Sequence, residues 1–280
     1  MHYGVTYFPT EYTLQPDVMG QLLEERGFES LWVAEHSHIP ASRISPWPGG
    51  PDLPQMYYDT YDPFLALMTA ANATTTLKVG TGIALVIQRD VIHTAKQVST
   101  LDRLSGGRFL FGIGAGWNIE EMADHGTDPE RRFGRLRESV AAMKQIWANE
   151  VAEYEGEQIS FGPMHQNPKP KQKPHPPIHV GGAFPGAMHR AVRYADGWLP
   201  IGARGSGSLD EQMTALDEAC AEAGRDRREI EVSVFGVAPK RETVDQLQSV
   251  GVDRVVFMPP SLPPDEMIDM VESFAAVIPG

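Results

Sequence analysis

A glutamate and a histidine, Glu35 and His36, follow a short apolar segment near the start of the chain. An imidazole gains or loses a proton near neutral pH, and an adjacent carboxylate can orient it or transfer a proton itself. Two other apolar segments, residues 78–85 and 108–116, are rich in glycine. Glycine in a strand usually marks a bulge, a bend or the close approach of another group. We therefore expect a flat ligand near this pair, resting against glycine-rich backbone.

Eight apolar segments alternate with helical patterns, which predicts the scaffold that positions these groups. The predicted strands are residues 4–8, 30–35, 77–84, 108–114, 177–181, 196–200, 230–235 and 254–258. The predicted helices are residues 15–26, 63–73, 91–104, 135–149, 209–223, 242–250 and 264–276, with one more beginning near residue 185. Strands that are apolar on both faces and alternate with helices pair in parallel. Eight such units predict one (β/α)8 TIM barrel domain over residues 1–280, with a doubly wound open sheet as the alternative.

Three connections are longer than a minimal barrel needs. A long loop, residues 36–61, follows the second strand, and an excursion, residues 151–177, precedes the fifth strand. A glycine-rich loop, residues 202–207, follows the sixth strand. Long loops usually form lids or binding sites. We expect a short hairpin around residues 159–161 within the excursion.

In such a barrel the active site lies at the C-terminal ends of the strands. The candidates there are mostly glycine and aromatic residues: Tyr7, Phe8, Glu35, His36, Gly82, Ile83, Gly114, Gly116, Trp117, Gly181, Gly182, Trp198 and Pro200. They include no carboxylate pair typical of a glycosidase and no His/Asp/Glu cluster, so we predict no metal site. Aromatic and glycine surfaces favour a planar cofactor that supplies the difficult chemistry.

The segment after the fifth predicted strand is a candidate phosphate site. Gly181 and Gly182 end that strand, and a helix begins shortly after them. Free backbone N–H groups at a helix N-terminus bind phosphate, although a simple glycine turn has the same sequence. His189 and Arg190, in the first turns of the helix, either add positive charge to the site or lie on the surface.

Composition excludes several classes of function. The formal net charge of −13 argues against general binding of nucleic acid. No run of about 18 apolar residues is present, so we expect no membrane span. Cys220 is the only cysteine, and the first residues show no signal-peptide pattern, which favours a cytoplasmic protein.

Several motifs stand together in a specific order. They are Leu31-Trp32-Val33-Ala34-Glu35-His36, Gly80-Thr81-Gly82-Ile83, Leu101-Asp102-Arg103-Leu104-Ser105-Gly106-Gly107-Arg108, Gly112-Ile113-Gly114-Ala115-Gly116-Trp117, Pro177-Ile178-His179-Val180-Gly181-Gly182 and Ala195-Asp196-Gly197-Trp198. Together they resemble the bacterial luciferase-like monooxygenase superfamily, and most closely its actinobacterial branch that uses the deazaflavin coenzyme F420. The resemblance covers about the first 200 residues.

The resemblance implies roles for individual residues. It implies a non-proline cis peptide at Gly82-Ile83 beneath the ring, and His36 near the reactive edge of the ring with Glu35 beside it. Gly114, Ala115, Gly116 and Trp117 would border the cofactor, and Gly181 and Gly182 would hold its phosphate. His189 lies near a position where some deazaflavin-dependent members have lysine. Relatives are often homodimers through the second and third helices.

The resemblance therefore implies an oxidoreductase that transfers hydride between F420 and a small organic substrate. The alternatives are an FMN-dependent monooxygenase, a flavin-binding relative without turnover, and a barrel hydrolase or metalloenzyme. Five aromatic residues favour an apolar or aromatic substrate, namely Tyr7, Trp47, Tyr57, Tyr58 and Trp198. Five cations are candidates for a groove that takes the anionic tail of F420: Arg131, Arg132, Lys169, Lys171 and Lys173.

Overall fold

Eight parallel strands form a closed barrel in the computed structural model, which describes residues 1–201 and 207–279. The barrel order is β1-β10-β9-β8-β7-β4-β3-β2. The bounds are β1 His2–Tyr7, β2 Ser30–Val33, β3 Lys78–Thr81, β4 Phe109–Ile113, β7 Ile178–Gly181, β8 Gly197–Leu199, β9 Glu231–Phe235 and β10 Arg254–Phe257. β1 pairs with both β2 and β10, so the sheet has no free edge. The predicted TIM barrel is confirmed.

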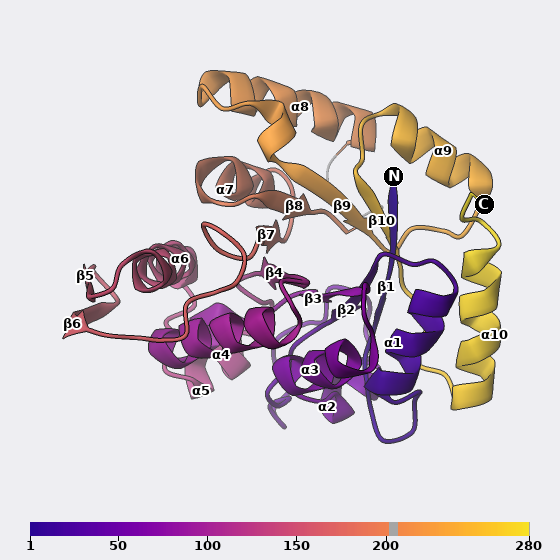
Figure 1. Cartoon of the computed structure of the whole chain (residues 1–280), viewed down its shortest axis with the longest axis horizontal. Coiled ribbons are helices and arrows are strands. Elements are labelled where there is room, and N and C mark those ends of the chain that lie inside the picture. Colours follow the sequence, from indigo (N-terminus) through magenta and orange to yellow (C-terminus); the bar gives the residue numbers. More distant parts are fainter. Residues whose placement is uncertain (202–206, 280) are drawn as a thin grey trace.

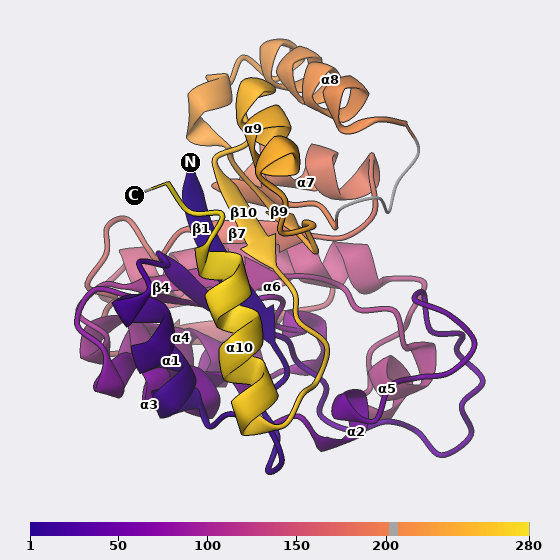
Figure 2. The same cartoon turned by 90° about the vertical axis from the view of Figure 1, so that its right-hand side faces the viewer.

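Helices surround the strands on the outside (Figure 1). Their bounds are α1 Pro16–Glu25, α2 Met56–Asp59, α3 Pro63–Ala73, α4 Val91–Leu104, α5 Ile119–Asp124, α6 Arg132–Ala148, α7 Gly186–Tyr194, α8 Leu209–Glu222, α9 Arg241–Ser249 and α10 Pro264–Ala275. Two short 3₁₀ helices are η1 Val86–Gln88 and η2 Arg227–Glu229. Figure 2 shows α10 and α1 side by side next to β1, where the barrel closes.

The connections mostly follow the prediction. The excursion before β7 contains the expected hairpin, formed by β5 Ala152–Glu155 and β6 Ser160–Met164. The predicted loop at residues 202–207 lies outside the described residues except for Gly207. The sequence analysis missed two short helices, α2 and α5. The start of α5 could have been predicted, because Asn118 is a typical N-cap residue; it accepts a hydrogen bond from the Glu121 N–H.

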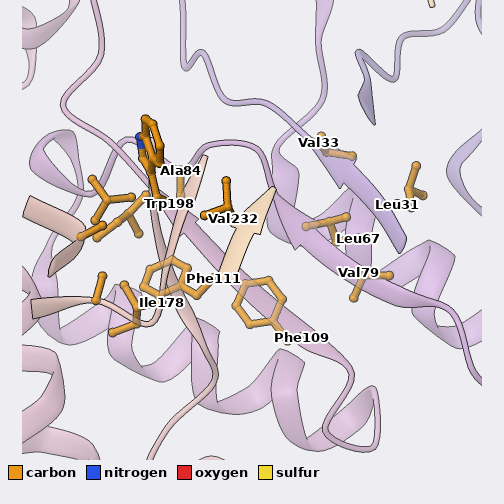
Figure 3. Packing of buried hydrophobic residues seen from close by; sticks show 14 of the residues in the cluster. Leu31, Val33, Leu67, Val79, Ala84, Phe109, Phe111, Ile178, Trp198 and Val232 are labelled. Carbon is orange, nitrogen blue, oxygen red and sulfur yellow. The ribbon is translucent and has the colours of Figure 1, made fainter. Parts of the chain in front are cut away.

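Buried side chains divide into two clusters on the two faces of the barrel wall. The smaller cluster comprises Trp32, Leu110, Leu199, Phe235 and Val256, with Ile83 packed against it. Their strand neighbours belong to the larger cluster, which packs between strands and helices (Figure 3). Successive side chains of a strand alternate between faces, so the smaller cluster fills the barrel interior.

The N-terminal end of the barrel interior is closed by charged residues. Arg254 is fully buried and donates hydrogen bonds to Glu29 at 2.8 and 2.9 Å, to Ser233 at 2.8 Å, and to Glu231. Lys78 forms a second ion pair with Glu29 at 2.8 Å. Buried charges of this kind are tolerated only when they are paired and hydrogen-bonded.

Candidate active site

The C-terminal ends of β2 and β3 bring His36 near an unusual peptide bond. Val33 is in register with Thr81, and the Gly82 N–H donates to the Val33 carbonyl at 2.8 Å. The peptide bond that follows, Gly82-Ile83, is cis, as predicted. His36 lies three residues beyond Val33, so both features stand at the same rim of the barrel.

Glycines of neighbouring strands make room for Ile83. A Cβ on Gly181 would lie 2.8 Å from Ile83 Cγ2, and a Cβ on Gly114 would overlap Ile83 Cδ1. Similarly, a Cβ on Gly80 would lie 2.5 Å from the Trp32 ring. These three glycines therefore accommodate side chains of the protein itself. This revises the expectation that their backbone is left bare for a flat ligand.

A buried carboxylate fixes the orientation of His36. His36 Nδ1 lies 2.8 Å from Glu121 Oε2, and the Ser37 N–H donates to Glu121 Oε1 at 3.0 Å. Burial opposes ionisation of Glu121, but the hydrogen bonds and charge of His36 and the Ser37 N–H outweigh it and lower its pKa. Because an ionised carboxylate only accepts, Nδ1 carries the proton, and Nε2 is the acceptor whenever the imidazole is neutral. Among the described residues no hydrogen bond to Nε2 is found.

The helix that carries Glu121 also holds the long loop in place. The preceding residue, Glu120, accepts hydrogen bonds from the Ser45 N–H at 2.6 Å and from the Ser42 hydroxyl. Ser45 Oγ in turn accepts from the Ile119 N–H at 3.0 Å. α5 thus anchors both the imidazole and the loop that covers the barrel rim.

Aromatic rings surround His36. Its ring centroid lies 5.4 Å from that of Tyr57 and 5.6 Å from that of Trp117. Tyr57 also contacts Trp47 at 5.6 Å and Phe8 at 4.6 Å. The structure therefore brings together five of the residues selected from the sequence, including Phe8, which follows β1.

Other selected residues lie elsewhere. Trp198 belongs to the core between strands and helices (Figure 3), as does Tyr7. Tyr58 is 45% exposed. Tyr7 and Trp198 face the helices because side chains alternate along a strand, so their neighbour Leu199 is the one that points into the barrel. Ala115 also packs in the helix-facing core, and Gly116 adopts a positive φ of 65° just before Trp117.

Glu35 is engaged in a structural network. Its carboxylate accepts a hydrogen bond from the Leu85 N–H at 2.6 Å and pairs with Arg89 at 2.5 Å. Arg89 also pairs with Asp62, which caps α3. These contacts tie the segment after β3 to β2 and α3, and they separate the role of Glu35 from that of His36.

The segment after β7 contains a cationic side chain aimed at the glycines. Gly182 has a φ of 133°, and a Cβ there would lie 3.7 Å from an Arg190 guanidinium nitrogen. Arg190 stacks on Phe133, and its Nε is buried without a hydrogen-bond partner in the described chain. Burial and the nearby charge of Arg132 lower the pKa of Arg190, opposed by Tyr194. An anion bound at this loop would accept a hydrogen bond from Arg190 Nε and would favour the charged form of Arg190.

His189 points away from this loop. It is exposed and lines a surface groove with Lys144, Arg193 and Asp196, near the N-terminal ends of the strands. Consecutive residues on a helix point in directions about 100° apart, which separates His189 from Arg190. The structure brings Arg190, and not His189, to Gly182.

The predicted cationic groove is not assembled in the described chain. Lys169 Nζ donates to the carbonyls of Ile146 and Asn149 at 2.5 Å each, at the C-terminal end of α6. Lys171 lies against Gly106 and Gly107, which precede β4 and belong to the opposite end of the barrel. Arg131 pairs with Glu157. Lys173 acts electrostatically on Lys169 and so belongs to the same region. Arg132 stacks on Phe133 beside Arg190 and is near the candidate phosphate site.

Two further observations concern the described residues as a whole. They contain no group of three or more His, Cys, Asp or Glu side chains arranged to hold a metal ion. None of their helices has the length and apolar character needed to cross a membrane.

The model of the family described as "Luciferase-like monooxygenase" matches residues 18–256. The chain belongs to this family. The match does not assign the chain to the F420-dependent branch of the family, because its relatives include both F420-dependent and FMN-dependent members.

Three relatives and one solved structure illustrate this range. A Mycobacterium tuberculosis protein named "Uncharacterized protein Rv0953c" is 37% identical, covering 99% of this chain and 98% of its own. A Kineococcus radiotolerans F420-dependent glucose-6-phosphate dehydrogenase is 29% identical over 75% of this chain and 59% of its own. A Pseudomonas putida FMNH(2)-dependent dimethylsulfone monooxygenase is 26% identical over 56% and 43%. The crystal structure of monooxygenase RslO1 from Streptomyces bottropensis matches with a TM-score of 0.79 at 19% identity, covering 99% and 98% of the two chains.

Proposed function

We propose that this protein is an F420-dependent oxidoreductase that transfers hydride between the deazaflavin and a small apolar or aromatic organic molecule. The observation that carries the proposal is His36, fixed through Nδ1 by a buried carboxylate and left with Nε2 as a proton acceptor inside an aromatic cluster. This arrangement stands at the same rim as the cis Gly82-Ile83 peptide. A base at that place serves chemistry in which a proton accompanies a hydride.

The residues present fit the phosphate of such a cofactor. The N–H groups following Gly181 and the unpartnered Arg190 Nε would hold it, and the start of α7 adds its dipole. F420 and FMN both carry a phosphate, so this fit applies to either cofactor. When bound, the deazaflavin would supply a ring carbon that accepts or donates hydride.

The chain would contribute orientation and proton transfer. Trp117 and Tyr57 would wall the pocket beside His36, and Trp47 would extend it toward the long loop. A substrate hydroxyl hydrogen-bonded to His36 Nε2 would give up its proton as hydride departs from the adjacent carbon. In the reverse direction protonated His36 would return that proton. Glu121 would stabilise the imidazolium in both cases.

Replacing Arg190 with leucine tests the cofactor site. A lost hydrogen bond to a charged group is worth about 1.5–3 kcal/mol, so we expect Arg190→Leu to weaken F420 binding about 10- to 100-fold. Fluorescence titration of the purified protein with F420, and separately with FMN, measures both affinities. Arg193→Leu is the matched control, because it removes the same charge from the same helix but on the groove side.

The two titrations also separate the alternatives. Tight FMN binding without affinity for F420 would replace the proposal with an FMN-dependent monooxygenase. Binding of neither cofactor would refute both. If F420 binds, His36→Ala distinguishes an enzyme from a flavin-binding relative without turnover, because only an enzyme loses hydride transfer while keeping its affinity.

We also propose that two copies pair through α3 and α4. The resemblance implies this pairing, and Leu65 on α3, 72% exposed, and Leu104 at the end of α4, 65% exposed, are apolar side chains that it would cover. Sedimentation of the wild type and of Leu65→Asp tests this pairing. A monomeric wild type would contradict it.

A further inference from the structure

A chain of hydrogen-bonding groups leads from His36 to the protein surface. Glu121 contacts His36 Nδ1 through Oε2, and its other oxygen lies 3.3 Å from the Ser37 hydroxyl. Ser37 Oγ lies 2.6 Å from His125 Nε2 and 2.9 Å from His38 Nδ1. His38 Nε2 contacts Asp124 at 3.0 Å. Every group in this chain can exchange protons, and the chain passes from a fully buried carboxylate to exposed imidazoles.

The outer end of the chain opens into a polar cavity of about 380 Å³. Its walls include His36, Ser37 and His125 together with Thr60 and Gln88. Thr60 Oγ1 and Gln88 Nε2 have no hydrogen-bond partner within the described chain. A cavity of this size with unpartnered polar groups has the room and the hydrogen-bonding partners that ordered water needs.

We propose that Glu121, Ser37 and His125 form a proton relay that connects His36 with water in this cavity. In the outward direction the His36 Nδ1–H proton moves to Glu121 Oε2. Rotation of the neutral carboxyl about Cγ–Cδ then presents the proton to Ser37 Oγ. The serine hydroxyl passes its own proton to His125 Nε2, which releases a proton to water. Each step breaks one N–H or O–H bond and forms one. The outward transfer leaves His36 protonated at Nε2, and the reverse hydride transfer, which gives that proton to a substrate, draws a proton inward along the same groups and restores Nδ1–H.

The use of this relay in catalysis rests on the proposed hydride transfer. A hydride carries both electrons of the broken bond, so the balancing proton must travel separately. His36 itself lines the cavity, and a cofactor and substrate bound at Nε2 would cover that direct way out. The relay begins at Nδ1, at the other nitrogen of the imidazole, and gives the proton a second exit.

Charged groups around the relay leave its members free to exchange protons. Within the cavity wall, Glu35 and Asp62 are both paired with Arg89. On the α5 side Asp124 is engaged by His38, and Glu120 by the loop. Glu121 is the carboxylate that directly faces both His36 and Ser37.

Exchange of the His36 Nδ1 proton with water tests the relay without any substrate. In protein labelled with ¹⁵N-histidine, saturation-transfer NMR measures this rate with and without bound F420 or FMN. We expect Ser37→Ala to slow exchange of the Nδ1 proton about 10-fold. Positioned proton transfer typically contributes about 100-fold or more, but water can replace part of the role of a hydroxyl that lies near the surface. Ser37→Thr should restore the rate. His93→Ala, which changes an exposed histidine on α4, should leave it unchanged.

Added imidazole separates a relay from a structural effect. It should accelerate exchange in His125→Ala, since it can occupy the place of the lost ring, but not in Ser37→Ala, where the hydroxyl is missing. Equal exchange rates in Ser37→Ala and the wild type would overturn the relay. If exchange behaves as expected but neither cofactor binds, the proposed function fails and the relay stands.

Discussion

The two ends of the barrel use buried polar groups in opposite ways. At the N-terminal end, Arg254, Glu29, Glu231 and Lys78 satisfy one another through ion pairs. Among the described residues, no partner is found for His36 Nε2 or for the buried Arg190 Nε at the C-terminal end. Paired charges stabilise a fold without offering anything to a ligand, whereas unpaired donors and acceptors are what a ligand can satisfy. The N-terminal end also holds one buried atom without a partner in the described chain, His179 Nδ1, but it lies against Gly197 within the charged cluster. The cluster of Arg254 therefore contributes to stability, and the C-terminal rim offers groups to a ligand.

The largest effect should follow from breaking the charged cluster at the N-terminal end. Arg254→Met leaves Glu231 without its cation and Glu29 with only the partly exposed Lys78, which should lower the free energy of unfolding by about 3–5 kcal/mol. Urea denaturation measures this loss. The matched control is Arg26→Met, whose exposed pair with Glu272 should contribute far less. Similar losses in both variants would contradict the special role of the buried cluster.

A smaller effect is expected from filling the space beside the cis peptide. Gly114→Ala places a methyl group on Ile83 Cδ1, and such overpacking costs about 1–3 kcal/mol. Ile83→Val removes Cδ1, so the double variant Gly114→Ala/Ile83→Val should regain most of the lost stability and cofactor affinity. Thermal unfolding and F420 titration check both. No rescue in the double variant would mean that Gly114 is needed for another reason.

The smallest effect concerns acid stability. Burial would raise the pKa of Glu29, but hydrogen bonds from Arg254 and Lys78 lower it to about 2. A carboxyl whose pKa is lowered by folding stabilises the folded protein at pH values above its pKa in the unfolded chain, near 4.5. This stabilisation is lost as the pH falls from 4.5 toward 2. Between pH 4.5 and 3.5 this loss should be about 1 kcal/mol.

Glu29→Gln isolates that contribution. Glu231, Arg254 and His179 belong to the same cluster. Burial lowers the pKa of His179 to about 4, so protonation of His179 also destabilises the folded protein as the pH falls. The stability of the wild type minus that of Glu29→Gln, followed from pH 6 to 3.5, should decline only below about pH 4.5. A constant difference would show that Glu29 gains nothing from its partners.

The order of strands and helices was predictable because the apolar segments are short, separate and alternate with helical patterns. The cis peptide was predictable only through the resemblance. Whether Tyr7 and Trp198 point into the barrel or toward the helices was not predictable, because a shift of one residue in strand register exchanges the two faces. The segments that end β1 and β8 gave no signal that fixes this register.

The carboxylate partner of His36 was missed for a different reason. Glu121 is 85 residues away along the chain, and the barrel brings it near by placing the end of β4 beside that of β3. The Asn118 cap marked the helix that carries it, but nothing in the sequence indicated its target. The sequence indicated that the glycines leave room for another group. It did not indicate that the side chains of Trp32 and Ile83 fill this room, because that depends on how the strands pack.

A crystal structure of the protein with F420 tests the central claim most directly. The account predicts the ring beside His36 at the rim that carries Gly82-Ile83, with the phosphate within hydrogen-bond distance of Arg190 Nε. Density for the cofactor in the groove lined by His189 and Arg193, or at the N-terminal end near Arg254, would contradict it.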